Sequence, residues 1–120
     1  MTTMGRLTTH VLDTSLGNPA AGLALRLYRL NGAERDLLKE AVTNDDGRVD
    51  GPVLEGADFS VGSYELEFEA GAYFDVLGIE LPKQKFLDVV VLRFGISAAD
   101  EHYHVPLLLS PFGYSTYRGS

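Results

Sequence analysis

Cysteine is absent from the 120-residue chain, and no long hydrophobic run occurs in it. Without cysteine, disulfide bonds, thiolate metal ligands and a cysteine nucleophile are excluded, and nothing points to an oxidising compartment. No apolar run approaches the roughly 20 residues of a membrane-spanning helix, and residues 1–12 hold no apolar segment long enough for a signal peptide. We therefore expect a soluble, cytoplasmic protein that makes no contact with membranes.

Positive charge is also scarce. Ten lysine and arginine residues face 17 aspartate and glutamate residues, which gives a formal net charge of −7. An acidic chain repels the phosphates of nucleic acids, so a nucleic-acid partner is not expected. The length fits one compact domain, residues 1–120, and a hydrophobic content of 45% is enough for a core.

Glycine and proline interrupt short apolar segments about every ten residues, a pattern typical of an all-β sandwich or barrel. Turn signals include Asn18-Pro19, Asn31-Gly32 and the polar run that ends at Gly47. We expect a two-sheet sandwich of seven to eight strands with one short helix over 70–77. The expected strands cover residues 5–13, 23–28, 37–43, 53–54, 64–69, 86–96, 102–109 and 114–120.

Alternation shows which faces of three strands are buried. In 64–69 the apolar residues face one way and three glutamates face the other. Segment 86–96 is apolar on both faces around Val89 to Leu92, which predicts that both faces are covered. In 102–109 one face is a core stripe, whereas the other carries His102 and His104 beside Pro106 and Leu108. Such a mixed face is typical of an interface or a pocket rather than of a solvent face.

Three histidines, His10, His102 and His104, are the candidate chemical groups. A His-x-His pair on a strand places both rings on one face, and a third histidine could complete a zinc site. No carboxylate stands in a ligand motif, and residues 44–51 do not match the calcium-loop pattern. Alternatively, a neutral imidazole takes a proton from water near neutral pH. Both readings stay open at this level, beside a purely structural use of His102.

Arg48 and the last residues of the sequence are the other polar candidates. Arg48 lies between Gly47 and Asp50-Gly51-Pro52, so its loop is tight and oriented. The rigid fork of guanidinium donors suits planar ring carbonyls. The segment Tyr117–Ser120 contains Tyr and Arg and is not a flexible linker sequence. This favours a terminal segment that packs against the domain over one that is frayed.

Four segments carry a family resemblance: LTTHVLDT at 7–14, TNDDGRVDGP at 43–52, HYHVPLLLSP at 102–111 and YSTYRGS at 114–120. In order and spacing they resemble the motifs of the 5-hydroxyisourate hydrolases, the transthyretin-related enzymes. The resemblance covers nearly the whole chain. One departure is that Ile79-Glu80-Leu81 precedes Pro82, where members often carry an aromatic pair. That position lies far in sequence from the four segments.

The resemblance implies a fold and an activity. Members are homotetramers of the prealbumin (transthyretin-like) fold, with active sites in a channel where subunits meet. They open the ring of 5-hydroxyisourate by adding water, which gives 2-oxo-4-hydroxy-4-carboxy-5-ureidoimidazoline in urate degradation. They use no metal and no cofactor. The implied partners are therefore a small-molecule substrate and further copies of the chain.

Carried onto this sequence, the resemblance implies His10, Arg48 and His104 as catalytic residues. His10 and Arg48 would also bind substrate, together with Tyr117 and Ser120. His104 or His10 would activate water, and Arg48 would orient the substrate and stabilise negative charge. The alternative is a transthyretin-like carrier of a small ligand, whose channel should be more apolar and needs no such polar cluster.

Overall fold

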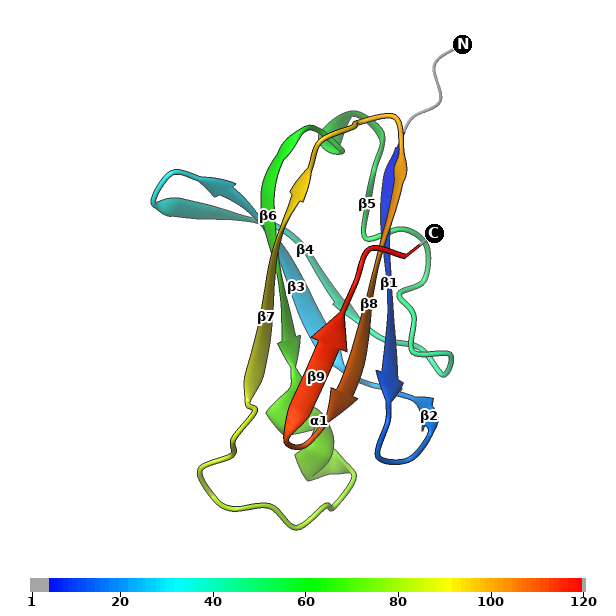
Figure 1. The fold of residues 1–120 in the computed structure, drawn as a ribbon, viewed down its shortest axis with the longest axis vertical. Helices are drawn as coiled ribbons and strands as arrows, with labels where there is room; N and C mark the ends of the chain where they lie inside the picture. Colours follow the sequence, from blue (N-terminus) through cyan, green and yellow to red (C-terminus); the bar gives the residue numbers. More distant parts are fainter. Residues whose placement is uncertain (1–4, 120) are drawn as a thin grey trace.

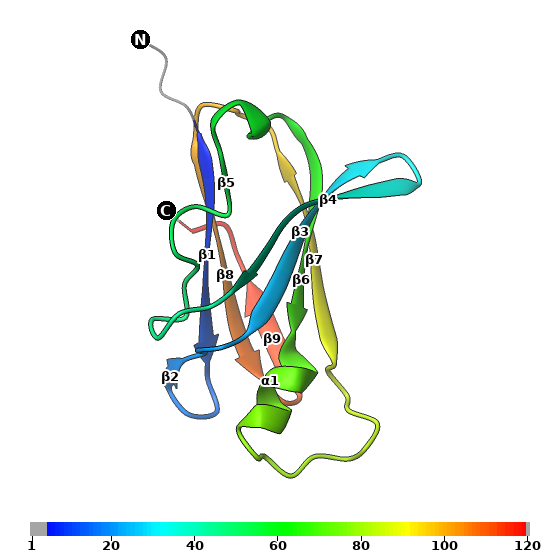
Figure 2. The same ribbon diagram turned by 180° about the vertical axis from the view of Figure 1, so that it is seen from behind.

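Two β-sheets pack face to face in the computed structural model, which describes residues 5–119 (Figure 1). The first sheet has the order β2-β1-β8-β9, with β5 added beside β1. The second has the order β4-β3-β6-β7. Within the first sheet β1 and β8 run parallel, and the other pairs are antiparallel. Turned to show its back, the molecule has the short helix α1 at one end of the sandwich (Figure 2).

The elements follow the expected order along the chain. Within residues 5–119 there are seven strands of four or more residues and two strands of two residues, so the predicted all-β sandwich with one short helix is confirmed. They are β1 (Arg6–Asp13), β2 (Asn18–Pro19), β3 (Ala24–Asn31), β4 (Glu34–Val42), β5 (Leu54–Glu55), a 3-10 turn η1 (Gly56–Asp58), β6 (Gly62–Glu69), α1 (Ala70–Val76), β7 (Val89–Ile96), β8 (His102–Ser110) and β9 (Gly113–Thr116).

The core lies between the two sheets and is built from alternate residues of each strand, as the period of two requires. Strand β8 is typical, because Tyr103, Val105, Leu107 and Leu109 are each at most 7% exposed while the residues between them face outward. No helix within residues 5–119 is long and apolar enough to cross a membrane.

Three local predictions were wrong. Asn18-Pro19 is not the turn; residues 14–17 turn, and Asn18 and Pro19 pair back onto Asp13 and Leu12. The chain turns earlier because the Asp13 carboxylate accepts hydrogen bonds from the backbone N–H groups of Ser15 and Leu16, inside the turn.

Strand β7 also differs from its prediction. It begins at Val89 rather than at residue 86, and Val89 and Val91 are 41% and 43% exposed. Their face is therefore exposed, because Val89 and Val91 lie opposite Glu69 and Glu67 and so belong to the outer face of the second sheet. The last strand, β9, ends at Thr116 and not at the end of the chain.

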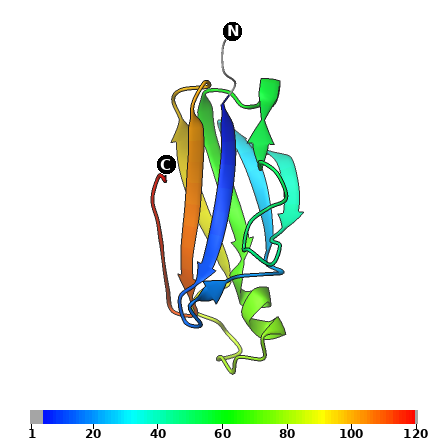
Figure 3. The ribbon, with the colours of Figure 1, turned by 90° about the vertical axis from the view of Figure 1, so that its right-hand side faces the viewer.

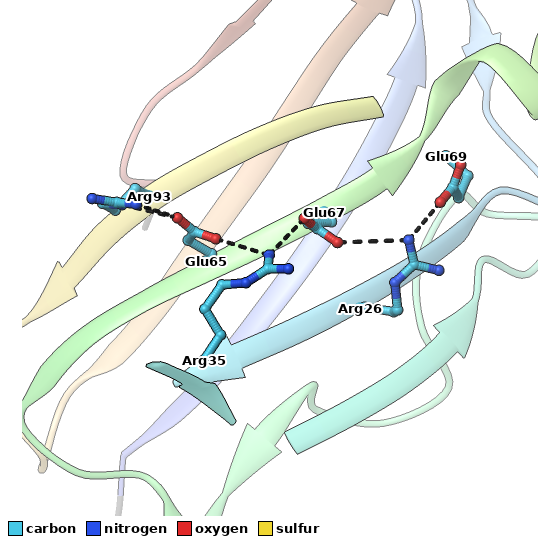
Figure 4. Close-up of polar contacts among 6 residues, drawn as sticks. All are labelled: Arg26, Arg35, Glu65, Glu67, Glu69 and Arg93. Carbon is cyan, nitrogen blue, oxygen red and sulfur yellow. Dashed lines mark hydrogen bonds and ion pairs between the residues drawn. The ribbon is translucent and has the colours of Figure 1, made fainter. Parts of the chain in front are cut away.

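A ladder of alternating charge covers the outer face of the second sheet (Figure 4). It confirms that the three glutamates of β6 share one face. Glu65 is only 4% exposed, and its carboxylate accepts hydrogen bonds from Arg93 Nε and Nη2 at 2.9 and 2.6 Å and from Arg35 Nη1 at 3.3 Å. Linked by successive ion pairs along β6, the ladder runs Arg93, Glu65, Arg35, Glu67, Arg26 and Glu69.

The ladder makes folding stability depend on pH. The hydrogen bonds from Arg93 and then Arg35 lower the pKa of Glu65 below 4.5, against the opposing effect of burial. A carboxylate with a lowered pKa stabilises the fold above its unfolded value and loses that contribution as pH falls through the folded value. Glu65 thus contributes at neutral pH and stops contributing in acid.

We expect Glu65→Gln to lower the free energy of unfolding by about 1–3 kcal/mol at pH 7, because a buried carboxylate with charged donors is removed. The loss should shrink below pH 4. Urea unfolding at fixed protein concentration measures both values, with Glu40→Gln as the matched control. Glu40 is exposed on β4 and forms no ion pair within residues 5–119. An equal effect of the two variants would contradict the assignment.

Candidate active site

The outer face of the first sheet carries the predicted histidines, because β1 and β8 pair in parallel (Figure 3). In this register Thr8 lies opposite His104 and His10 lies opposite Pro106. Residues opposite each other in a sheet point to the same side. The pairing therefore places His10 and His104 on one face although 94 positions separate them in sequence, and both are partly buried there.

Arg48 reaches this face through a loop beside β1. The Asn44 side-chain oxygen accepts a hydrogen bond from the Arg48 backbone N–H at 3.1 Å, which folds the loop on itself. Gly47 has a φ of 75°, and a Cβ there would collide with the Val11 carbonyl oxygen. Val11 N–H donates to Gly47 O at 2.8 Å, and Arg48 forms an isolated antiparallel bridge with His10. The sequence's tight loop thus holds Arg48 next to His10.

The end of the described chain docks onto β8. Gly119 N–H donates to the His104 carbonyl oxygen at 2.7 Å, so the backbone runs directly beside the histidine. The Arg118 guanidinium stacks 3.9 Å from the centre of the Tyr103 ring and donates to Glu101 at 2.8 Å. Arg118 is therefore engaged in holding the tail, and the tail forms one border of the face that carries the histidines (Figure 3).

Two predicted substrate-binding residues belong to this tail. Tyr117 is 60% exposed beside the docked segment, available to a ligand or to another chain. Ser120 lies outside the described residues. The structure thus brings His10, Arg48 and His104 together on one face, whereas Tyr117 lines a cavity between β7 and β9.

Thr8 is a residue of this face that the sequence reasoning did not single out. Its Oγ1 lies 2.7 Å from His102 Nε2 and 2.8 Å from His104 Nδ1. The period of two along a strand could have indicated it, since Thr8 precedes His10 by two residues and so shares its face. What could not be read from sequence is the register with β8.

The surroundings of His102 and His104 favour their neutral forms. Burial lowers the pKa of His104, and the nearby Arg48, His102 and His10 lower it further. The pKa of His102 is lowered by burial and then by Arg6 and Arg118. A neutral imidazole has a free lone pair on one ring nitrogen, which is the state that a general base requires.

The zinc alternative needs three ring nitrogens directed at one point. Within residues 5–119 no three His, Cys, Asp or Glu side chains are grouped so that they could hold a metal ion. Two of the nitrogens in question, His102 Nε2 and His104 Nδ1, are instead turned toward the Thr8 hydroxyl. The geometry fits hydrogen bonding between these side chains better than metal ligation.

A cavity of about 430 Å³ lies elsewhere, between β7 and the pair β8 and β9. It is lined on one side by Val91 and Phe94 and on the other by Tyr103 and Tyr114. Neither His10, Arg48 nor His104 borders it. Tyr117 and Arg118 of the tail do line it, so the tail contacts both the cavity and the polar face.

A two-sheet sandwich with a parallel β1–β8 pair, a helix after β6 and a His-Arg-His face defines a transthyretin-like protein with a polar site. The comparisons agree. The pattern of the HIUase/Transthyretin family matches residues 7–119, and the chain belongs to that family.

Individual relatives extend the match over the whole chain. It is 64% identical over 120 residues to "5-hydroxyisourate hydrolase 2" of Rhizobium meliloti (strain 1021), covering 100% of both chains. A crystal structure of (S)-allantoin synthase matches with a TM-score of 0.94 and 52% identity, over 99% of this chain and 45% of that chain. Sea bream transthyretin in complex with thyroxine matches with a TM-score of 0.85 and 28% identity, over 95% of this chain and 94% of that chain.

We expect Arg48→Gln to raise the pKa of His104 part of the way toward 6.5, because Arg48 is the second cause of its lowered value after burial. NMR titration of the His104 ring proton measures this directly, and the sign is fixed because removing a cation favours the imidazolium. Arg93→Gln, which changes an arginine on the other sheet, is the control. If the His104 pKa were unchanged in Arg48→Gln, the two side chains would not share a site.

Proposed function

We propose that this protein is a 5-hydroxyisourate hydrolase that acts in urate degradation without a metal or a cofactor. Full-length identity of 64% to a protein of that name supports the proposal. The observation that carries it is the convergence of His10, Arg48 and His104 on one face of the first sheet. Residues 1–120 act as a single domain in this proposal.

In the proposed mechanism His104 is the general base. Its Nδ1 is turned to Thr8 and its Cδ2 edge to Gly119, so Nε2 is the ring nitrogen left for water. Nε2 takes a proton from water while the water oxygen attacks the ring carbonyl carbon. The carbon–nitrogen bond of the cyclic amide then breaks, and the departing nitrogen receives a proton from the imidazolium. The net reaction adds one water and consumes no other reagent.

Arg48 and His10 have charge-handling roles in this mechanism. The developing negative charge on the carbonyl oxygen needs fixed donors nearby, and a guanidinium held by its loop supplies them. His10, bridged through its backbone to Arg48, orients the flat ring beside it. Tyr117 and Ser120 are proposed to bind the substrate together with His10 and Arg48.

A transthyretin-like carrier is the second candidate, because sea bream transthyretin shares the fold. The polar face disfavours it here. A carrier of an apolar ligand needs no neutral histidine beside an arginine, and the identity to that protein is 28% against 64% to the hydrolase. Fold alone does not decide function, whereas the side chains of the site do.

We expect purified protein to accelerate the decay of freshly generated 5-hydroxyisourate, followed by ultraviolet absorbance, with or without a chelator. His104→Ala should lower kcat/KM by about 10²- to 10⁴-fold, the usual contribution of a general base. Glu40→Gln, on the other sheet, should retain activity. Decay no faster than the spontaneous rate would sink the hydrolase proposal, and loss of activity with chelator would revive a metal site.

We further propose a homotetramer in which the outer face of the first sheet meets the same face of another copy. Two features of this face support the proposal: polar and apolar side chains lie side by side on it, and they are only partly buried. Leu12 and Leu108 lie opposite each other beside the histidines and are only partly buried. Apolar side chains beside a polar site are stabilised when a second surface covers them, which also excludes water from the reaction.

Leu108→Glu should weaken assembly through this face and lower activity together, because a buried charge at an apolar contact is costly. Sedimentation velocity should show a smaller species than the wild type. Val76→Glu makes the same change at a helix position that is 88% exposed and should alter neither property. A Leu108→Glu protein with wild-type mass and activity would exclude the proposed face.

Cytoplasmic location stays a prediction, to be checked by cell fractionation.

A further inference from the structure

The Thr8 hydroxyl lies between two imidazole rings, and this position has a consequence for their protons. Oγ1 is 2.7 Å from His102 Nε2 and 2.8 Å from His104 Nδ1. A hydroxyl has one proton to donate and lone pairs to accept with. It therefore cannot donate to both rings at once, and at least one ring must donate to it if both contacts are hydrogen bonds.

Three arrangements satisfy this rule when both histidines are neutral. Thr8 donates to His102 and accepts from His104, or both rings donate to Thr8, or Thr8 donates to His104 and accepts from His102. The first two place the His104 proton on Nδ1 and leave a lone pair on Nε2. Only the third places a proton on Nε2.

The surroundings of His104 favour a lone pair on Nε2. Arg48 is the foremost charged neighbour that acts on the ring, and a cation is repelled by an N–H and attracted by a lone pair. In the first arrangement the Thr8 hydroxyl proton is donated to His102 Nε2. In the second arrangement neither histidine accepts that proton. Partly buried polar groups are stabilised when each proton has a partner.

Gly119 holds the ring from the opposite side. A Cβ at Gly119 would lie 2.7 Å from His104 Cδ2, and the Gly119 N–H already donates to the His104 backbone. The imidazole is therefore confined between the Thr8 hydroxyl and the Gly119 backbone. Its orientation does not depend on the substrate being present.

We propose that Thr8, with His102 as the acceptor of its proton, is a positioning residue that fixes His104 in the Nδ1–H form with Nε2 free as the base. This inference rests on the proposed hydrolase function for its catalytic meaning. The position of the proton on His104, by contrast, can be measured in the protein without substrate. Orientation of a histidine by a hydrogen bond to its other nitrogen is a general device, and its loss costs about tenfold to a hundredfold in metal sites.

The test compares Thr8→Val, Thr8→Ser and Thr9→Val. Valine matches threonine in shape and removes both hydrogen bonds, whereas serine keeps the hydroxyl. Thr9 is the matched control, because it follows Thr8 on β1 but faces the core. Its hydroxyl donates to the Val105 carbonyl oxygen of β8. Ring ¹⁵N chemical shifts of His104, recorded above its pKa, report which nitrogen carries the proton and need no substrate.

We expect the Nδ1–H pattern in the wild type, Thr8→Ser and Thr9→Val, and a mixed or Nε2–H pattern in Thr8→Val. The kcat of Thr8→Val for 5-hydroxyisourate should fall about tenfold or more with little change in KM, and serine should restore most of it. His102→Phe removes the acceptor of the Thr8 proton and should increase the Nε2–H form.

Two results would overturn the inference: an Nε2–H pattern in the wild type, or a Thr8→Val protein whose His104 shifts and kcat match the wild type. A folded wild type that shows the expected shifts but no hydrolysis would instead overturn the proposed function. The proton assignment would then stand on the spectra alone, so the two failures are distinguishable.

Discussion

The parallel pairing of β1 with β8 is the constraint on which the site depends. Its register places Thr8 against His104 and His10 against Pro106, while alternate residues of the same strands fill the core. Because side chains alternate strictly between the faces, a slip by one residue would bury the histidines and expose the core stripe. The free energy of burying Leu7, Val11 and Leu107 therefore also holds the polar residues in position.

The rest of the molecule braces this pair from its edges. The loop that carries Arg48 contacts β1 on the side away from β8, between β5 and β2, with Asn44 and Gly47 closing it. The tail follows β8 on the other side, anchored by Arg118 on Tyr103 and by Gly119. Three segments distant in sequence thus converge on one face, as electrostatic preorganisation of a site requires.

The two outer faces of the sandwich are built for different surroundings. The second sheet presents a complete charge ladder, in which Glu65 and its neighbours are paired with arginines, and such a face is well solvated. The first sheet presents neutral histidines beside Pro106 and Leu108. We place the proposed contact with another copy on the first sheet, where the partly buried Leu12 and Leu108 lie beside the histidines.

Much of this could be predicted from sequence where the information is local. Alternation in β6 and β8 predicted which side chains face inward, and the glycine-rich loop indicated an oriented Arg48. The Thr8 contacts, however, depend on a register between strands 94 residues or more apart in sequence, which no local pattern encodes. The exposed face of β7 was missed for the same reason, since its register with β6 places Val89 and Val91 on the outer face beside the glutamates.

A crystal structure with bound urate, the unhydrolysed precursor ring, would show which face of the protein holds the substrate ring. We expect the ring on the outer face of the first sheet, in contact with Arg48 and with His104 Nε2 directed at its edge. Urate found instead in the cavity between β7 and β9, with the outer face empty, would contradict it.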